Sequence, residues 1–183
     1  ITSIGYRMIY GTRVASITVP KNVKSCNSTS GIGTLGGCDY LKEIIFEDGT
    51  EAVPLYIASG ATKVERVVIP EGVKQIGYDA FRETKKLSQI VLPESLTVIE
   101  SGAFLESGLK SITIPGKITK VGHYAFQSSQ LESVIFADGD EYTKATLGNY
   151  VFENCEKLET VKLSENITSI GYRMIYGTRV ASI

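Results

Sequence analysis

The feature that most constrains this chain is internal repetition. The 17 residues ITSIGYRMIYGTRVASI at positions 1–17 recur unchanged at 167–183, an offset of 166 residues. Within that unit, one apolar residue opens a strand-like block every 22 to 27 residues. These residues are Val14, Leu41, Val64, Leu87, Leu109, Leu131, Leu158 and Val180. Such a short repeat cannot bury its own apolar face, so the period predicts a solenoid of stacked repeats.

Each of these apolar residues begins the pattern L-x-x-I-x-I, which is often followed by proline. Clear copies are VERVVIP at 64–70, LSQIVLP at 87–93 and LKSITIP at 109–115. Alternation of Val, Ile and Thr with a period of two predicts a short strand with one buried face. Proline has no N–H to donate, so we expect it to end the strand. The blocks therefore predict parallel strands stacked roughly 4.8 Å apart in one sheet.

A second block, I-G-x-x-A-F, lies upstream of the strand blocks. It reads IGYDAF at 76–81, IESGAF at 99–104 and VGHYAF at 121–126, with looser copies elsewhere. The glycine suits a positive-φ turn or a close approach of two backbones. We expect the A-F pair to form one helical or 3₁₀ turn that directs the phenylalanine inward.

The joined pattern I-G-x-x-A-F-x-x-C-x-x-L-x-x-I-x-I-P resembles the BspA-type leucine-rich repeat. The best copy is IGYDAFRETKKLSQIVLP at 76–93, with Thr84 where that family often has cysteine. The resemblance is weakest at 26–36 and 47–62. It implies an α/β, β-rich, right-handed leucine-rich-repeat solenoid, a horseshoe or arc. The parallel sheet would line its concave face, and short helical or 3₁₀ turns its convex side.

The resemblance also implies a role and a place. Members of this family are surface proteins of host-associated bacteria and some parasitic protists, thought to act as adhesins or binding modules. We therefore expect an extracellular or cell-surface protein that binds other proteins. A repeat motif specifies a fold far more closely than a function, because solenoids accept many partners.

The repeats also set an expected domain organisation. Residues 1–183 are expected to form a single array of about seven repeats of 22–27 residues plus a partial eighth. The chain starts before IGYRMI and stops inside VASI, without a polar capping repeat at either end. We therefore expect either a fragment of a longer array built on the 166-residue unit, or a unit that stacks head to tail.

Three insertions depart from the regular repeat. FEDGTE at 46–51 and FADGDE at 136–141 replace the proline turn, and CNSTS at 26–30 lengthens another repeat. Asp-Gly is a tight-turn signal. We expect these segments to protrude from the edge of the solenoid.

The charge pattern excludes several classes of partner. Nineteen basic and twenty acidic residues leave a net charge of −1, without blocks of like charge. Nucleic-acid grooves and anionic membrane surfaces require clustered Lys and Arg. No apolar run approaches the 18 residues of a membrane span. We therefore expect neither nucleic-acid binding nor membrane insertion in this segment.

The sequence does not indicate catalysis or a cofactor. His123 is the single histidine, and other repeats carry Tyr or Ser at its position. No second histidine is present to complete a catalytic dyad. The stretch GIGTLGG at 31–37 lacks the lysine of a phosphate-binding loop and aligns with a degraded I-G-x-x-A-F block. We predict a non-enzymatic protein without a cofactor.

A metal site is not predicted either. Cys26, Cys38 and Cys155 form no C-x-x-C pair. Cys38 and Cys155 stand five repeats apart, on the order of 24 Å, too far for a disulfide, and are expected to be buried. A Cys26–Cys38 pair remains open. The acidic turn with Asp138, Asp140 and Glu141 has oxygen ligands for a hard cation but otherwise lacks a calcium loop, so a solvated turn is expected.

The candidate site is the outward face of the predicted strands. Between the two inward Ile positions lie Thr18, Ile45, Val68, Val91, Thr113, Ile135 and Lys162. All but Lys162 are β-branched, and these residues either stabilise neighbouring strands or form an apolar protein-binding patch rimmed by charge. On the second interpretation the partner-binding residues are Ile45, Arg66, Val68, Gln89, Val91, Thr113 and Ile135.

Two function classes therefore remain open. One is a binding or adhesion module of a cell-surface or secreted protein, with a host or matrix protein as partner. The other is a structural spacer or filament, whose partner is another copy joined end to end.

Overall fold

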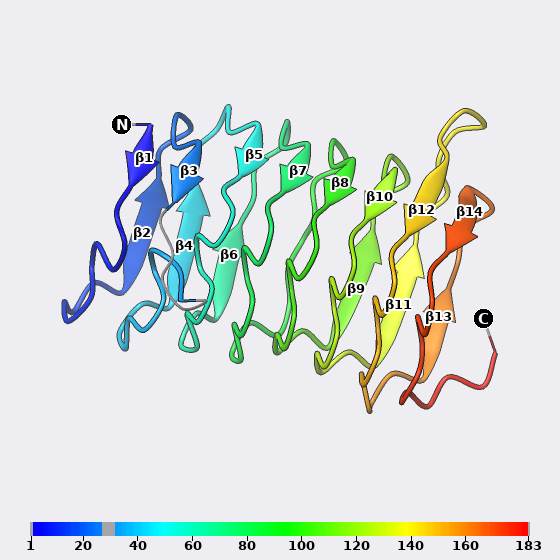
Figure 1. The fold of residues 1–183 in the computed structure, drawn as a ribbon. Coiled ribbons are helices and arrows are strands. Elements are labelled where there is room, and N and C mark those ends of the chain that lie inside the picture. The colour runs from blue at the N-terminus through cyan, green and yellow to red at the C-terminus, as the bar shows by residue number, and fades with distance from the viewer. Residues whose placement is uncertain (1, 27–31, 183) are drawn as a thin grey trace.

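The chain forms a β-solenoid in which each turn of backbone stacks on the one before it. The computed structural model describes residues 2–26 and 32–182. The stack advances from the N-terminal to the C-terminal end, with strands on two opposite walls (Figure 1). Every strand pair is parallel. The predicted solenoid of parallel strands is confirmed.

One wall, which we call the long-strand wall, is built from the L-x-x-I-x-I blocks. Its strands are β2 (Ser16–Val19), β4 (Glu43–Phe46), β6 (Arg66–Val68), β9 (Ser111–Ile114), β11 (Ser133–Phe136) and β13 (Thr160–Lys162). They pair in the register that the repeat predicts, for example Thr18 with Ile45 and Ile45 with Val68. Pro20 and Pro115 directly follow β2 and β9. The strand prediction is confirmed for these six blocks.

The prediction of one uninterrupted sheet is wrong at a single repeat. The long-strand wall consists of two three-stranded sheets, β2-β4-β6 and β9-β11-β13. The block LSQIVLP at 87–93, between them, forms no strand. Ile90 and Leu92 are nevertheless buried and Val91 points outward. The apolar pattern therefore predicts side-chain direction here, but not backbone pairing.

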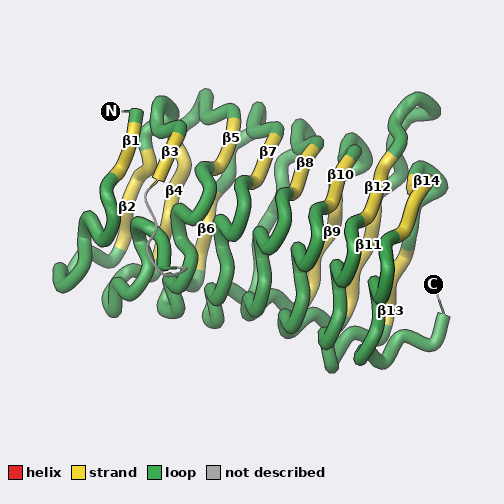
Figure 2. The backbone as a smooth tube through the Cα atoms, viewed as in Figure 1, coloured by secondary structure: helices red, strands yellow, loops and turns green. Residues whose placement is uncertain are grey.

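The opposite wall, which we call the short-strand wall, was not predicted. Its strands are β1 (Ser3–Ile4), β3 (Ser25–Cys26), β5 (Ala52–Val53), β7 (Gln75–Ile76), β8 (Val98–Ile99), β10 (Lys120–Val121), β12 (Ala145–Leu147) and β14 (Ile167–Ile170). The first two pair with each other, and the last six form one continuous sheet (Figure 2). Many of them end at the isoleucine, valine or leucine that opens the I-G-x-x-A-F block.

The expected helical or 3₁₀ turns are absent, and the α/β assignment is wrong in that respect. Residues 2–26 and 32–182 contain no helix of any kind. Each I-G-x-x-A-F turn instead has two residues in the left-handed region, as at Asp79 (φ 49°) and Glu83 (φ 58°) or Tyr124 (φ 58°) and Ser128 (φ 55°). Because one lies just before the A-F pair and the other two residues after it, a right-handed helix cannot form there.

The glycines of the I-G blocks allow two backbones to approach closely. Of the two roles expected for this glycine, a positive-φ turn or a close backbone approach, the structure confirms the close approach. A Cβ on Gly77 would lie 2.6 Å from the backbone nitrogen of Leu55 in the preceding repeat. A Cβ on Gly122 would lie 2.4 Å from the nitrogen of Ser101. Only glycine leaves room for this spacing.

A single apolar core fills the space between the walls, and phenylalanines form its spine. Phe81, Phe104, Phe126 and Phe152 are fully buried, as predicted for the A-F pair. Their ring centroids follow one another at 5.4, 5.2 and 5.5 Å in stacked pairs. Phe46 and Phe136 meet the ends of this row edge-on. Stacked aromatic pairs contribute about 0.5–1.5 kcal/mol each beyond burial.

Candidate functional site

The outward face of the long-strand wall carries all seven candidate residues. In β9, Ser111 and Thr113 are exposed while Ile112 and Ile114 are buried, which is the alternation of a strand with one face in the core. The same alternation places Ile45 outward in β4 and Ile135 outward in β11. The structure therefore puts these side chains on one surface.

Val91 is the centre of this surface. Its side chain is 84% exposed, whereas Val68 one repeat earlier is half-buried. A hollow of about 410 Å³ on one side of Val91 is lined by Arg66, Val68 and Gln89. A second hollow of about 520 Å³ on its other side is lined by Thr113 and Ile135, among others. The two hollows together bring five of the other six predicted residues around Val91.

Ile45 is the seventh residue and lies outside this group. It pairs with Val68 in the β4–β6 ladder and is only half-exposed. It therefore extends the apolar stripe by one strand toward the N-terminal end.

An ion pair forms a charged rim at that end of the surface. The carboxylate of Glu43 accepts hydrogen bonds from the Ser16 hydroxyl, at 2.8 Å, and from the Arg66 guanidinium. The Ser16 hydrogen bond, followed by that of Arg66, lowers the pKa of Glu43 below its ordinary value. Arg66 is therefore already paired with Glu43 of the neighbouring strand. This ion pair can be recognised only when the repeats are placed in register.

The remaining polar motifs serve the fold. All three cysteines are buried and free, so Cys26 and Cys38 are not bonded to each other. Burial raises the pKa of the Cys155 thiol, which disfavours the reactive thiolate. Among the described residues, no group of three or more His, Cys, Asp or Glu is placed to hold a metal ion.

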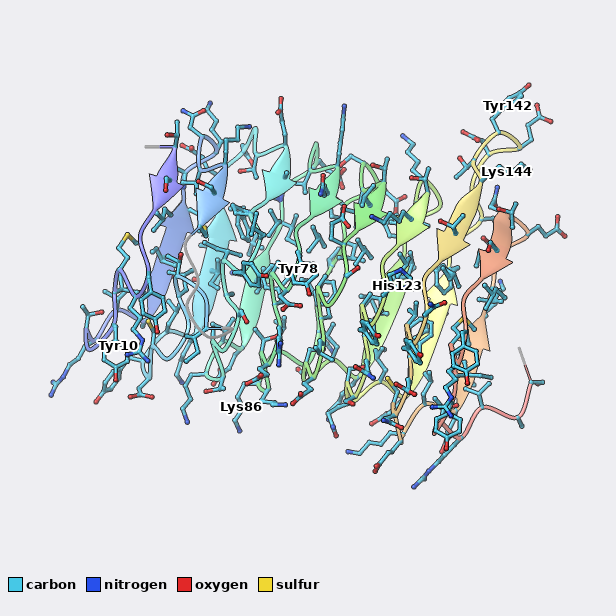
Figure 3. The ribbon with its side chains drawn as sticks, viewed as in Figure 1. Tyr10, Tyr78, Lys86, His123, Tyr142 and Lys144 are labelled. Carbon is cyan, nitrogen blue, oxygen red and sulfur yellow. The ribbon has the colours of Figure 1, made fainter. Side chains whose placement is uncertain are left out.

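The loop between β11 and β12 protrudes beyond the walls, as predicted, with Tyr142 near its tip and Lys144 directly before β12 (Figure 3). Asp140 does not face outward as a free ligand. It accepts hydrogen bonds from the backbone N–H and the hydroxyl of Thr143, both at 2.8 Å. The hydroxyl bond is the largest cause of the lowered pKa of Asp140. The inserted segment at 26–30 lies largely outside the described residues.

Sequence reasoning missed a column of tyrosines along the I-G-x-x-A-F turns. Tyr124 and Tyr150 stack at 4.9 Å between centroids, and Tyr150 meets Tyr172 edge-on at 5.6 Å. The recurrence of Tyr in these blocks was the available signal. These ring contacts join successive repeats, and Tyr124 and Tyr172 remain exposed.

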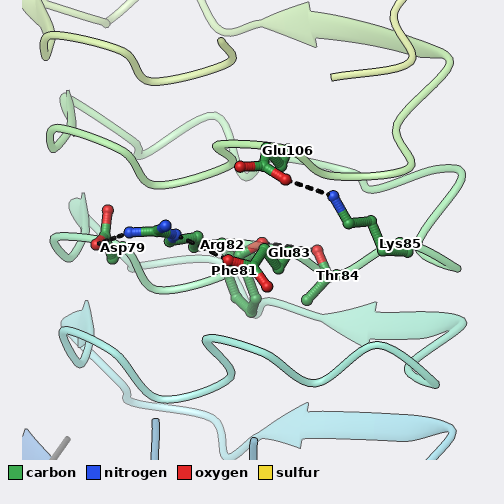
Figure 4. A network of polar contacts seen from close by, with 7 residues as sticks. All are labelled: Asp79, Phe81, Arg82, Glu83, Thr84, Lys85 and Glu106. Carbon is green, nitrogen blue, oxygen red and sulfur yellow. Dashed lines mark hydrogen bonds and ion pairs between the residues drawn. The ribbon is translucent and has the colours of Figure 1, made fainter. Parts of the chain in front are cut away.

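The same turns hold a buried carboxylate. Asp79 is 5% exposed and lies 3.6 Å from the Arg82 guanidinium, which also pairs with Glu83 (Figure 4). Burial is the largest cause of the raised pKa of Asp79, and Arg82 opposes it. A second pair, Lys85 with Glu106 at 2.7 Å, connects this turn to the next repeat.

The stacked parallel strands and inward Leu and Ile positions define the protein as a leucine-rich-repeat solenoid. The profile of the BspA type leucine rich repeat region matches residues 29–147 and 83–183, in six copies. The chain belongs to this family. Within the described residues we find no helix with the length and apolarity needed to cross a membrane.

Two solved structures share the fold. A leucine-rich repeat protein of T. pallidum is 24% identical, with a TM-score of 0.79, over 98% of this chain and 83% of that one. A leucine-rich repeat protein of Bacteroides ovatus ATCC 8483 is 23% identical, with a TM-score of 0.63, over 92% of this chain. The match spans 50% of the B. ovatus protein. Comparison with curated proteins gave no match.

Proposed function

We propose that this chain is a non-enzymatic protein-binding module of a cell-surface or secreted protein, one repeat array that docks its partner on the outward face of the long-strand wall. The observation that carries the proposal is Val91, an aliphatic side chain 84% exposed between two hollows. Exposed apolar surface rimmed by polar residues is typical of protein-interaction sites.

Strand stabilisation does not account for Val91. β-branched side chains stabilise a sheet through contacts between paired strands. Val91 belongs to no strand, whereas Ile45 and Val68 lie in the paired strands β4 and β6. An exposed valine outside a ladder supports the binding interpretation for the centre of the surface.

Substitution on this wall tests the proposal. Purified wild-type chain would be applied to a panel of immobilised extracellular-matrix proteins, and any complex would be measured by biolayer interferometry. Val91→Glu is expected to weaken binding at least tenfold, because it places a charge in the centre of an apolar contact. The matched control, Thr18→Glu, lies on the same wall at its N-terminal edge and is expected to leave the affinity within twofold.

The proposal fails if the panel gives no complex. The assignment of the surface fails separately if binding survives substitution of Ile45, Val68 and Val91 together. Circular dichroism of each variant would verify that the array remains folded.

The recurrence of residues 1–17 at 167–183 favours a second candidate, a spacer or filament of tandem 166-residue units. Parallel ladders between repeats extend without a closing partner, so a head-to-tail contact of this kind produces an open fibre unless its rotation closes into a ring. Electron microscopy of the concentrated chain would show regular fibres if copies stack, and separate particles if they do not.

A further inference from the structure

The long-strand wall loses its backbone pairing at one repeat. Over the described residues 88–92, no backbone N–H donates a hydrogen bond. The Ser88 carbonyl accepts the one backbone hydrogen bond of this stretch, from the Lys110 N–H at 3.1 Å. The carbonyls of residues 89–92 accept none. Both sheets of this wall therefore end against the same segment.

The equivalent positions of neighbouring repeats are bonded. The N–H groups of Glu65 and Arg66 both donate to the Lys42 carbonyl, at 2.8 and 3.0 Å. The N–H groups of Glu132 and Ser133 both donate to the Lys110 carbonyl, at 2.7 and 3.5 Å. By this pattern, Ser88 and Gln89 would donate to Glu65, but they do not.

The same repeats remain joined everywhere else. On the short-strand wall, Ile76 pairs with Ile99 in an unbroken ladder that continues to β10. In the core, the rings of Phe81 and Phe104 stack at 5.4 Å. The separation is therefore confined to the long-strand wall.

Nothing in the unpaired sequence opposes a strand. Gln89-Ile90-Val91-Leu92 contains β-branched residues and neither glycine nor proline, and Ile90 and Leu92 already point into the core. A backbone hydrogen bond contributes about 0.5–1.5 kcal/mol net. A strand-forming segment left unpaired is a local conflict between sequence and structure, of the kind expected at functional or strained sites.

We propose that residues 88–92 form a seam at which the long-strand wall opens and closes. The half containing β2, β4 and β6 and the half containing β9, β11 and β13 would move about the intact short-strand wall. The structure is the open state, and the closed state pairs the seam with β6 on one side and with β9 on the other. Closing reshapes the hollow of about 410 Å³ beside Val91, so the seam adjusts the candidate surface. This motion involves the chain alone and requires no partner.

Hydrogen–deuterium exchange of the whole chain is the first test. Amides of residues 89–92 are expected to exchange at least tenfold faster than those of β4 and β11, each paired on both sides. Equal protection of the seam and these two strands would overturn the proposal.

Disulfide trapping is the second test, and it includes a matched control. The variant Val68→Cys/Val91→Cys spans the seam, whereas Ile45→Cys/Val68→Cys spans the paired strands β4 and β6. Closing brings the seam cysteines within the Cα separation of roughly 4.4–6.8 Å that a disulfide needs. The native cysteines are buried and common to both variants.

We expect both disulfides to form under mild oxidation. The seam disulfide should slow exchange of residues 89–92 at least tenfold, and the control disulfide should leave it unchanged. A seam pair that fails to oxidise when the control does, or that oxidises without slowing exchange, would contradict a seam that closes.

Discussion

The imidazole of His123 accepts a hydrogen bond from the backbone N–H of Asn149, one repeat further on, with Nδ1 2.8 Å from the nitrogen. Asn149 repeats the arrangement, since its Oδ1 accepts the N–H of Tyr172 at 2.9 Å. In both repeats, the side chain that follows the glycine of the I-G-x-x-A-F block accepts a hydrogen bond from a backbone N–H of the next repeat. The only histidine of the chain therefore connects two repeats. It lies shortly after β10, at the start of the I-G-x-x-A-F turn (Figure 3).

Replacement of His123 therefore tests a structural role. His123→Leu removes the acceptor, and we expect it to lower the free energy of unfolding by about 1 kcal/mol. His123→Asn supplies the acceptor used at Asn149 and should cost less than half as much. Urea denaturation of the two variants measures the difference, and an equal loss in both would refute the hydrogen-bond explanation.

Gly102 permits the carboxylate of Asp79 to lie directly against the next repeat. Gly102 has φ +66°, and a Cβ there would lie 1.9 Å from Asp79 Oδ1. Gly102→Ala is expected to destabilise the array by about 2 kcal/mol or more, because left-handed strain of about 1 kcal/mol adds to the clash. The control is Gly72→Ala, which has φ +96° but open space around its Cβ, so that strain acts alone.

Thermal unfolding of these variants separates the two causes. Addition of Asp79→Ala to Gly102→Ala removes the clash and should recover part of the lost stability. If Gly72→Ala and Gly102→Ala lower stability equally, the contact with Asp79 is irrelevant.

Asp79 also gives the fold a pH dependence of defined sign. Burial raises its pKa above the ordinary 3.8, so the folded chain holds this proton more tightly than the unfolded chain. The contribution of Asp79 to the free energy of unfolding therefore falls as pH rises from 3.8 through the raised pKa. Asp79→Asn cannot ionise and should lack this component.

Denaturant unfolding of wild type and Asp79→Asn across that pH range measures the component directly. The stability difference is expected to move in favour of Asp79→Asn as pH rises. A difference that is constant with pH would show that the Arg82 ion pair cancels the effect of burial, and one that moves the other way would show that the ion pair outweighs it.

Side-chain direction was predictable from the sequence because it depends on local alternation. Leu41, Ile44 and Phe46 are all buried, as L-x-x-I-x-I requires. Pairing at 89–92 was not predictable, since a ladder depends on the position of the neighbouring repeat as well as on strand propensity. The candidate surface divides in the same way: alternation identifies Val91 as outward, but the hollows beside it depend on how the neighbouring repeats are placed.

The turns show a different limit. Alanine and phenylalanine after a glycine suit a helical turn, and Glu83 is not a residue type that usually adopts positive φ, whereas aspartate, as at Asp79, does so more often than most. Their left-handed conformations are imposed by stacking, for the Asp79 N–H donates to the Ser101 carbonyl and the Glu83 N–H to the Leu105 carbonyl in the next repeat. These contacts between repeats override the local preference of Glu83.

The phenylalanine row should be the most sensitive part of the array. Phe104 is fully buried and stacks on Phe81 at 5.4 Å and on Phe126 at 5.2 Å, so its removal leaves a cavity between two repeats. Phe104→Ala is expected to cost about 3–5 kcal/mol. Val91→Ala, on an exposed side chain, should remain within about 0.5 kcal/mol of wild type. Chemical denaturation measures both, and a loss below about 1 kcal/mol for Phe104→Ala would mean that neighbouring repeats collapse into the space and that the stacked rings do not hold the array together.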